Sequence, residues 1–228
     1  ARKVVVCHIG SGASLCAIED GKCMDTTMGL TPLDGVMMGT RCGSIDPATV
    51  CYLQREGGYT FDEVDEMMNK KSGLLAVTGG KTNDCRNVEE LAAAGDPEAQ
   101  LAFDMFVYKI AAKAAEMATS MCGMDTLVFT AGIGENDDIV RAQVCAGMEA
   151  FGIKLDQKEN STRKPGARTI SAPESRIPVY VSILSLIKYI LMEIRHPSRL
   201  FYPRMENEIK SPYNACLLYT SPSPRDCS

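Results

Sequence analysis

The chain has 228 residues, of which 45% are hydrophobic and 23% charged, and its net charge is -5. This composition is typical of a globular protein with a sizeable core, in one large domain or two modest ones. The acidic balance and the lack of a Lys/Arg run argue against nucleic acid or a membrane as the partner, and favour a small-molecule ligand.

Two apolar runs flank a Gly-Ser-Gly turn at the start of the chain. Residues 4–6 and 15–18 are β-branched or apolar and predict two strands. Gly10 and Gly12 can take positive φ, and successive amides of such a turn can bind an anion. The first hypothesis is therefore a nucleotide-handling site, and the alternative is an ordinary hairpin loop.

The next segment predicts a hairpin and then a loop. Asp20 and Gly21 have the pattern of a hairpin turn, which leads into a third antiparallel strand over residues 22–27. A glycine- and methionine-rich loop follows without clear periodicity and carries an isolated arginine, Arg41.

Two short helices are expected after this loop. Asp46 and Pro47 predict the N-cap and first position of one helix. Thr60 and Glu63 have the spacing of a capping box for a second helix, which we expect Gly73 to stop. A loop is predicted over residues 75–87.

A long helix and a βα unit are predicted in the second half. From Asp96 to residue 122, apolar residues recur every three or four positions. Residues 127–130 predict a strand, followed by a glycine loop and a helix whose apolar face extends to Phe151. Glycines at such a crossing favour a second nucleotide site, although Gly132 and Gly134 also suit a plain turn.

The ten cysteines are scattered, with no CxxC pair and no secretory signal. We expect reduced thiols in a cytoplasmic protein. Cys7, Cys16 and Cys122 are expected to serve as small buried apolar residues. The two histidines lack metal-ligand spacing, so we assign no metal to protein ligands.

Five separated segments resemble the carboxyl-terminal half of the acetate kinase family of short-chain acyl kinases. They are HIGSGAS, DTTMGLTPLDGVMMGTRCGSIDP, KKSGLLAVTGG, NDCR and FTAGIGEN. The resemblance covers about residues 3–181. It implies an α/β domain of the actin, sugar-kinase and Hsp70-like ATPase fold (ribonuclease H-like), with a mixed sheet flanked by helices. It also implies a homodimer and reversible phosphoryl transfer from ATP to acetate, giving ADP and acetyl phosphate, with Mg²⁺.

The resemblance further implies roles for individual residues. Arg41 matches an arginine regarded as a transition-state stabiliser. The residues that would contact the ATP phosphates are His8, Ile9, Gly10, Ser11 and Gly12. A second nucleotide segment is matched by Asp84, Cys85 and Arg86, and the adenosine-side loop by Gly132, Ile133, Gly134, Glu135 and Asn136.

These roles suit the chemistry, because phosphoryl transfer depends on positioning and charge neutralisation, and a planar guanidinium can hold two phosphoryl oxygens. Other interpretations stay open. Arg41 could be a loop arginine paired with Asp34 or Asp46, and His8 a hydrogen-bonded strand-end histidine. Ser11 also departs from the family, which usually has asparagine there, and Cys85 stands where the family commonly has methionine or a similar apolar residue.

The chain starts at Ala1 and a predicted strand begins within two or three residues of it, so we expect a fragment. The resemblance implies that the acetate pocket belongs to the family's amino-terminal domain, which precedes this segment. After residue 181 the family would continue to an Asn-Glu-Glu segment whose glutamate helps to bind Mg²⁺. Residues 183–194 instead predict an amphipathic helix too short to span a bilayer. Residues 216–226 resemble a translated sequencing adapter. We expect residues 1–181 to be a nucleotide-binding domain and 182–228 a divergent tail from a frame or assembly error.

Three functional hypotheses follow. The first is an acetate kinase domain that binds nucleotide but is inactive alone, with propionate or butyrate kinase as alternatives in the same class. The second is a non-catalytic ATP-dependent clamp of the actin or Hsp70 kind, in which the Arg41 loop has no evident place. The third is an inactive, imperfectly folded product.

Overall fold

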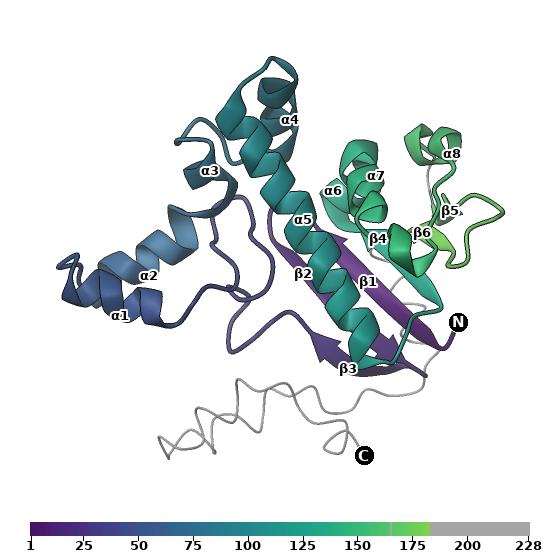
Figure 1. Cartoon of the computed structure of the whole chain (residues 1–228), viewed down its shortest axis with the longest axis horizontal. Helices are drawn as coiled ribbons and strands as arrows, with labels where there is room; N and C mark the ends of the chain where they lie inside the picture. Colours follow the sequence, from purple (N-terminus) through teal and green to yellow (C-terminus); the bar gives the residue numbers. More distant parts are fainter. Residues whose placement is uncertain (165, 183–228) are drawn as a thin grey trace.

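The computed structural model describes residues 1–164 and 166–182, and within them a mixed sheet forms the centre of the molecule (Figure 1). Its strand order is β3-β2-β1-β4-β6-β5. The strands are β1 Lys3–Ile9, β2 Ala13–Glu19, β3 Lys22–Thr26, β4 Thr126–Thr130, β5 Arg168–Thr169 and β6 Val179–Val181. β1 pairs antiparallel with β2 and parallel with β4, and β4 pairs parallel with β6. The three antiparallel strands expected at the start of the chain are confirmed.

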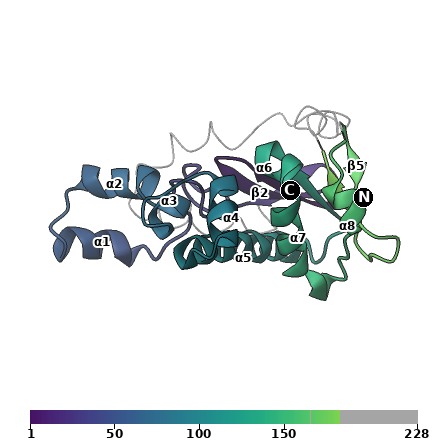
Figure 2. The same ribbon diagram turned by 90° about the horizontal axis from the view of Figure 1, so that it is seen from above.

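Helices flank this sheet. They are α1 Ala48–Arg55, α2 Phe61–Lys70, α3 Gly73–Val77, α4 Cys85–Ala93, α5 Pro97–Ser120, α6 Ala131–Asn136, α7 Asp138–Ala146 and α8 Gln157–Ser161, with a 3-10 helix, η1, at Glu149–Phe151. Figure 2 shows α4, α5 and α7 on the same side of the sheet. The predicted long helix is confirmed as α5, whereas α7 is shorter than expected because Phe151 belongs to η1.

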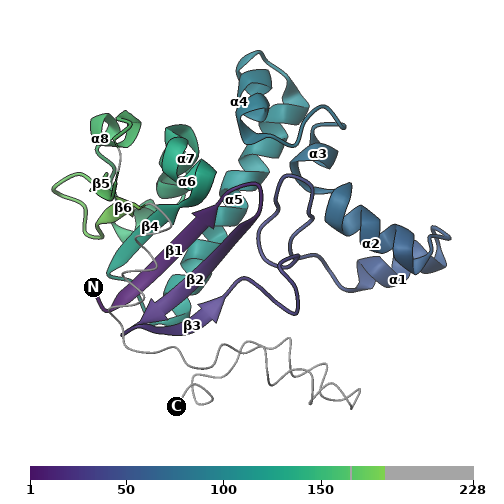
Figure 3. The ribbon, with the colours of Figure 1, turned by 180° about the vertical axis from the view of Figure 1, so that it is seen from behind.

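α5 lies across one face of the sheet, as Figure 3 shows from behind. Alternate residues of β1, Val5 and Cys7, are buried in the main core with Phe106 and Ile110 of α5. The residues between them face the other side of the sheet, because side chains alternate along a strand. On that side the described residues form a small cluster around Val6. The alternation therefore turns the even-numbered positions of β1 away from α5.

The βα crossing after β4 differs from the prediction. The expected glycine loop is the short helix α6, so that prediction was wrong. The chain turns directly at Ala131, whose φ is +68°. Its N–H donates to the Glu135 carboxylate (3.1 Å), and the Asn136 amide donates to the Gly132 carbonyl (2.9 Å). Side chains within the segment thus stabilise a helix that two glycines would otherwise disfavour.

The α1–α2 pair extends away from the sheet (Figure 1). The predicted capping box is confirmed: Thr60 N–H donates to the Glu63 carboxylate (2.8 Å), and Glu63 N–H donates to the Thr60 hydroxyl (3.3 Å). Gly73 was expected to stop α2, but instead it begins α3, with a φ of +64°. A Cβ there would overlap the Met38 carbonyl oxygen, so close backbone packing requires glycine. The prediction of a loop over 75–87 missed the end of α3 and the start of α4.

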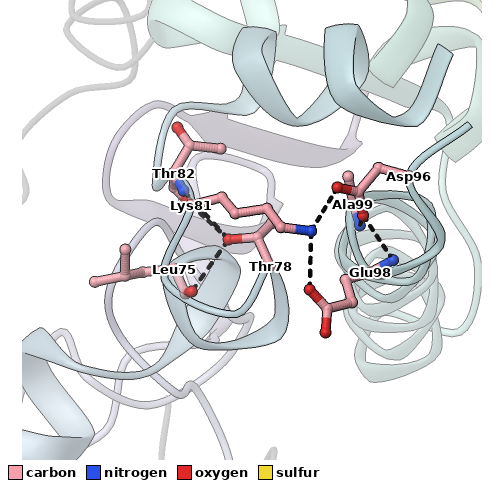
Figure 4. A network of polar contacts seen from close by, with 7 residues as sticks. All are labelled: Leu75, Thr78, Lys81, Thr82, Asp96, Glu98 and Ala99. Carbon is pink, nitrogen blue, oxygen red and sulfur yellow. Dashed lines mark hydrogen bonds and ion pairs between the residues drawn. The ribbon is translucent and has the colours of Figure 1, made fainter. Parts of the chain in front are cut away.

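Lys81 connects the segment between α3 and α4 to the start of α5 through ion pairs. Figure 4 shows Lys81 between two carboxylates, Asp96 and Glu98, and both are ion-paired with it. Asp96 also caps α5 by accepting the N–H of Ala99 (3.2 Å). Within the loop, the Thr78 hydroxyl donates to the Thr82 carbonyl oxygen (3.0 Å). These contacts set the path of the chain just before α4.

No disulfide joins the eight cysteines in the described part of the chain. Cys7 is buried and Cys16 half-buried, but the expectation for Cys122 was wrong, because it is exposed in a turn with a φ of +55°. None of the helices within residues 1–164 and 166–182 is long and apolar enough to cross a membrane. The expectations for residues 183–228 and their predicted helix lie outside the described residues.

Candidate functional site

The turn between β1 and β2 forms one wall of an open pocket of about 240 Å³. The pocket lies at the edge of the sheet where the parallel strands β1 and β4 end. Its lining residues are His8, Gly10, Ser11, Gly12, Ala13, Ser14, Met28, Pro32 and Arg41. The fold thus brings the Gly-Ser-Gly turn together with Arg41, which is distant in the sequence. We call this space the Arg41 pocket.

Two backbone amides of this turn, both in residues that line the pocket, are open. Gly10 N–H donates to the Gly12 carbonyl (2.9 Å), whereas the amides of Ser11 and Gly12 have no acceptor among the described residues. Neither Gly10 nor Gly12 takes the positive φ that the sequence suggested. Their lack of a side chain matters for close approach instead: a Cβ on Gly12 would lie 3.6 Å from Nη1 of Arg41. Two unpaired, neighbouring N–H groups can bind an anion.

The Arg41 guanidinium is half-buried at the side of this turn. Its Nη1 donates to the Met38 sulfur (3.7 Å), and no ion pair joins it to a carboxylate in the described part of the chain. Asp34 instead accepts from Ser44 (2.6 Å), and Asp46 from the amide of Ala48 (2.9 Å). The alternative of an Asp34 or Asp46 partner was therefore wrong. A guanidinium with spare donors at the wall of a pocket suits phosphate or carboxylate oxygens.

Backbone hydrogen bonds hold the loop that carries Arg41 against α2 and α3. Met38 N–H donates to the Arg41 carbonyl (3.0 Å), and Leu74 N–H donates to the Met38 carbonyl (2.9 Å). Ser72 N–H donates to the carbonyl of Thr40 (2.9 Å). The loop is irregular in shape, but the carbonyls of Met38, Gly39, Thr40 and Arg41 each accept a backbone hydrogen bond, which defines its path.

The predictions for His8 and Ile9 have different outcomes. His8 lies on β1 between Ser14 of β2 and Thr130 of β4, and it lines the Arg41 pocket. Its imidazole makes no hydrogen bond to a described residue, so the strand-end alternative was wrong. Ile9 points the other way, into the core beneath α5, and is fully buried. Only the backbone of Ile9 is available to a ligand.

The segment of Asp84, Cys85 and Arg86 approaches the Arg41 pocket without lining it. The carbonyl oxygen of Asn83 lies 2.9 Å from the position of a Cβ on Gly39, which in turn would be 3.7 Å from the Ser11 carbonyl oxygen. Asp84 caps α4 and forms an ion pair with Arg86 (2.6 Å), which lowers the pKa of that carboxyl. The Cys85 thiol is buried, and burial raises its pKa well above the usual range.

The α6 segment is next to the same turn, because a Cβ on Gly10 would lie 3.7 Å from the Cβ of Ala131. Within α6, Gly134 is buried and Ile133 packs against the core. Glu135 and Asn136 line a second cavity, of about 330 Å³. The other residues around that cavity are Arg163, Lys164, Gly166, Arg168 and Val181. The predicted adenosine-side residues are therefore divided between core and cavity.

A family model of the Acetokinase family matches residues 1–184. The chain belongs to the acetokinase family. It is 50% identical over 178 residues to an acetate kinase of Oleidesulfovibrio alaskensis and 53% identical over 178 residues to one of Desulfovibrio desulfuricans. Each match covers 78% of this chain and 44% of the relative. The chain thus spans less than half the length of these curated relatives.

Solved structures of the same family share the fold. The crystal structure of Porphyromonas gingivalis acetate kinase matches with a TM-score of 0.77 at 38% identity, covering 86% of this chain and 49% of that one. A propionate kinase from Francisella tularensis matches with a TM-score of 0.73 at 40% identity, covering 79% of this chain and 45% of that one. The expected actin, sugar-kinase and Hsp70-like ATPase fold, a mixed sheet flanked by helices, is confirmed.

Several residues of this acetokinase site escaped the sequence analysis. Met28 and Pro32 line the Arg41 pocket from the loop that leads to Arg41, and the proline in that loop was the available signal. Arg163 and Arg168 line the second cavity, and Nε of Arg168 is buried without a partner in the described residues. No periodicity or motif marks this basic pair, because it comes together only where the segment after α8 returns to the sheet.

One group in the described residues has ligand atoms spaced as for a metal: Cys85, Glu89 and Asp137, all within 4.8 Å of one another. Burial and a hydrogen bond with Asp137 raise the pKa of Glu89 to about 8. The buried Oε1 of Glu89 has no hydrogen-bond partner among the described residues, and the Asp137 carboxyl lies close to it. Burial beside a second carboxyl group favours the protonated form of Glu89.

Proposed function

We propose that residues 1–181 form the nucleotide-binding domain of an acetate kinase, which transfers a phosphoryl group between ATP and acetate to give ADP and acetyl phosphate. The observation that carries the proposal is Arg41, which lies without a carboxylate partner in one pocket with the open amides of Ser11 and Gly12. The names of the relatives, which match 78% of this chain, support the same activity.

In this proposal the turn and Arg41 both bind the phosphates. The open amides of Ser11 and Gly12, with Gly10 allowing close backbone approach and His8 beside them, position the phosphoryl groups in the Arg41 pocket. The guanidinium of Arg41 neutralises charge that spreads over the phosphoryl oxygens during transfer. Such positioning and neutralisation are the main protein contributions to phosphoryl transfer.

The remaining nucleotide contacts are assigned to the segments beside that pocket. We place residues 84–86 and 132–136 around the rest of the nucleotide, with the backbone of Ile9 at the phosphates. Because Ile133 and Gly134 pack inward, Glu135 and Asn136 supply the accessible side chains of α6. Cys85 contributes through its backbone, since its thiol is buried.

Mg²⁺ takes part in the proposed reaction, but the Arg41 pocket has few suitable ligands for it. No carboxylate is among the residues that line this pocket, whereas Mg²⁺ prefers carboxylate and phosphate oxygens. We therefore propose that Mg²⁺ arrives on the nucleotide phosphates and that its main protein ligands come from outside the described residues. When bound, it supplies charge neutralisation at the phosphates.

The proposal extends to the extent and surroundings of the domain. We propose that the chain alone binds nucleotide without turnover, because it matches only 44% of the length of its relatives. We also propose that residues 182–228 are a divergent tail. Resequencing of the source locus tests this, and an uninterrupted reading frame through residue 228 would contradict it. Cytoplasmic location is proposed from the eight described cysteines, none of which forms a disulfide.

There are two alternatives, one in the same class and one in another. Propionate or butyrate kinase is in the same class and changes only the acyl group, and the Francisella tularensis propionate kinase gives this alternative support at 40% identity. A non-catalytic clamp of the actin or Hsp70 kind would use the same fold. Arg41 favours the kinase, because a clamp does not require a guanidinium without a carboxylate partner in the pocket beside the phosphate turn.

A homodimer is also proposed, through α5. Leu101, Met105 and Tyr108 lie on one face of this helix and are 54%, 36% and 67% exposed. Their spacing of four and three residues makes a continuous apolar stripe. A second copy of the chain would cover such a stripe symmetrically.

The test begins with titration of Mg-ADP into the 228-residue chain by calorimetry. Saturable binding is expected, and its absence contradicts the nucleotide site. The chain is then joined to the amino-terminal half of an acetate kinase relative, and Arg41→Ala is compared with Arg55→Ala, an exposed arginine on α1. Arg41→Ala should lower kcat by about 10³-fold or more while ADP affinity changes little. Equal losses in kcat and affinity would contradict the assigned role.

A further inference from the structure

Arg141 is a fully buried arginine that the proposed reaction does not use. It lies in α7 with only 1% of its surface exposed. No ion pair joins it to a carboxylate within residues 1–164 and 166–182, and burial lowers its pKa to about 10, so it remains charged at neutral pH. A buried charge is costly unless hydrogen bonds compensate it, so its contacts are informative.

Neutral oxygens provide that compensation. Arg141 Nε donates to Oδ1 of Asn160 (2.8 Å), and Nη2 donates to the Asn160 backbone carbonyl (2.7 Å). Nη1 donates to the carbonyl of Gly134 (3.0 Å). Asn160 in turn donates through Nδ2 to the Asp138 carbonyl (2.9 Å). One side chain of α7 is thus bonded to both α6 and α8.

The Gly134 carbonyl belongs to a helix that needs external support. α6 has six residues, two of them glycine, and a helix of that length is not stable on its own. It also starts at Ala131 in a left-handed conformation, which the surrounding structure has to maintain. The hydrogen bond from Arg141 ties the middle of α6 to neighbouring elements.

We propose that Arg141, oriented by Asn160, is a positioning residue that fixes α6 for nucleotide binding. This inference rests on the proposed function, in which residues 132–136 contact the adenosine side of the nucleotide. Arg141 is too buried to touch the ligand and acts through the Gly134 carbonyl. Its loss lowers the fraction of molecules in which α6 has the binding geometry, and apparent affinity falls by that fraction.

The test compares two ligands of the 228-residue chain, ADP and pyrophosphate, by calorimetry. Pyrophosphate probes the turn at residues 10–12, and only ADP also requires α6. Arg141→Met should weaken ADP binding about tenfold or more and change pyrophosphate affinity less than twofold. Arg141→Lys keeps the charge and should lie between the two. Arg55→Met is the matched control and should leave both affinities unchanged.

Hydrogen exchange supplies a readout that does not depend on a ligand. Amides of residues 131–136 should exchange faster in Arg141→Met, while those of residues 3–19 stay protected. Equal weakening of ADP and pyrophosphate, or unchanged ADP binding, would overturn the proposal. If the unmodified chain binds neither ligand, the proposed function fails, and unchanged protection of residues 131–136 in Arg141→Met or Arg141→Lys then overturns the positioning role as well.

Discussion

Ala131 carries backbone strain at the point where β4 turns into α6. Its φ of +68° is a conformation that costs an alanine roughly 1 kcal/mol, because its Cβ approaches the neighbouring carbonyl oxygen. Such strain is often found at ligand-binding positions. Here it lets the chain turn within one residue and places Ala131 beside Gly10 in the phosphate turn.

Replacing this residue by glycine should therefore stabilise the protein. We expect Ala131→Gly to raise the free energy of unfolding by up to about 1 kcal/mol, measured by urea denaturation of the 228-residue chain. Ala112→Gly, on the exposed side of α5, is the control and should lower it by about 0.5–1 kcal/mol. A loss of stability in Ala131→Gly similar to the control would show that the turn is not strained.

At this scale the sequence was informative where residue type limits the possibilities. Gly10 and Gly12 pointed to a close backbone approach, and Arg41 to a charge without a local partner. The strain at Ala131 was not predictable, because alanine is not a residue type that indicates a positive φ. The inward direction of Ile9 and the exposure of Cys122 also depend on the sheet and turn around them rather than on residue type.

Between elements, a pair of carboxyl groups joins α4 to the start of α7. Asp137 caps α7 by accepting the N–H of Val140 (2.9 Å), and the carboxyl of Glu89 in α4 lies close to it. The pKa of Glu89 is raised from its ordinary value of 4.5 to about 8, mainly by burial. The folded protein therefore binds the Glu89 proton more tightly than the unfolded chain does, over the range between those two pH values.

A pH dependence of stability follows from this pair. The free energy of unfolding should fall as pH rises from about 4.5 to 8 and then level off with respect to this group, because the folded state must lose a proton that it favours. Glu89→Gln keeps a donor toward Asp137 without the charge, and it should flatten this part of the profile. Urea denaturation across pH 4.5–9 measures both, with Glu90→Gln on the exposed side as control. A profile identical in Glu89→Gln and the unmodified chain would contradict the raised pKa of Glu89.

Elements were predictable when their signal was local. The capping box at Thr60 and the apolar periodicity of α5 are properties of neighbouring residues, and both were confirmed. Gly73 looked like a helix stop because glycine ends many helices, whereas its actual role is to pack on the Met38 carbonyl. The helix α6 depends on Arg141 and Glu135, so its glycine-rich sequence alone predicted a loop.

At the scale of the whole molecule, the apolar stripe on α5 is one surface that the described residues leave uncovered. We expect the 228-residue chain to be a dimer in sedimentation equilibrium, and Tyr108→Glu to shift it toward monomer by placing a charge in the contact. Tyr52→Glu is the matched control, because Tyr52 on α1 is 63% exposed and Tyr108 on α5 is 67% exposed. A monomeric parent chain, or equal dissociation in both variants, would contradict a dimer through α5.

The global arrangement could be expected only through the family resemblance. The hairpin of β1 and β2 follows from local turn signals, but the place of β4 beside β1 joins residues more than a hundred positions apart. The same long-range pairing brings Ala131 to the phosphate turn. Composition and periodicity do not encode such contacts individually, whereas five matched segments in one order indicate them together.

The fastening of the Arg41 loop affects the entropy of binding. Three of its carbonyls accept from Ser72 and α3, the Cys42 amide donates to α2, and Gly73 allows the backbones to meet without a side chain between them. Fixing one residue's backbone costs about 1–2 kcal/mol of conformational entropy, and here that loss occurs when the chain folds. A phosphoryl group that reaches Arg41 therefore meets an ordered loop, and its full interaction with the guanidinium can appear as affinity or rate.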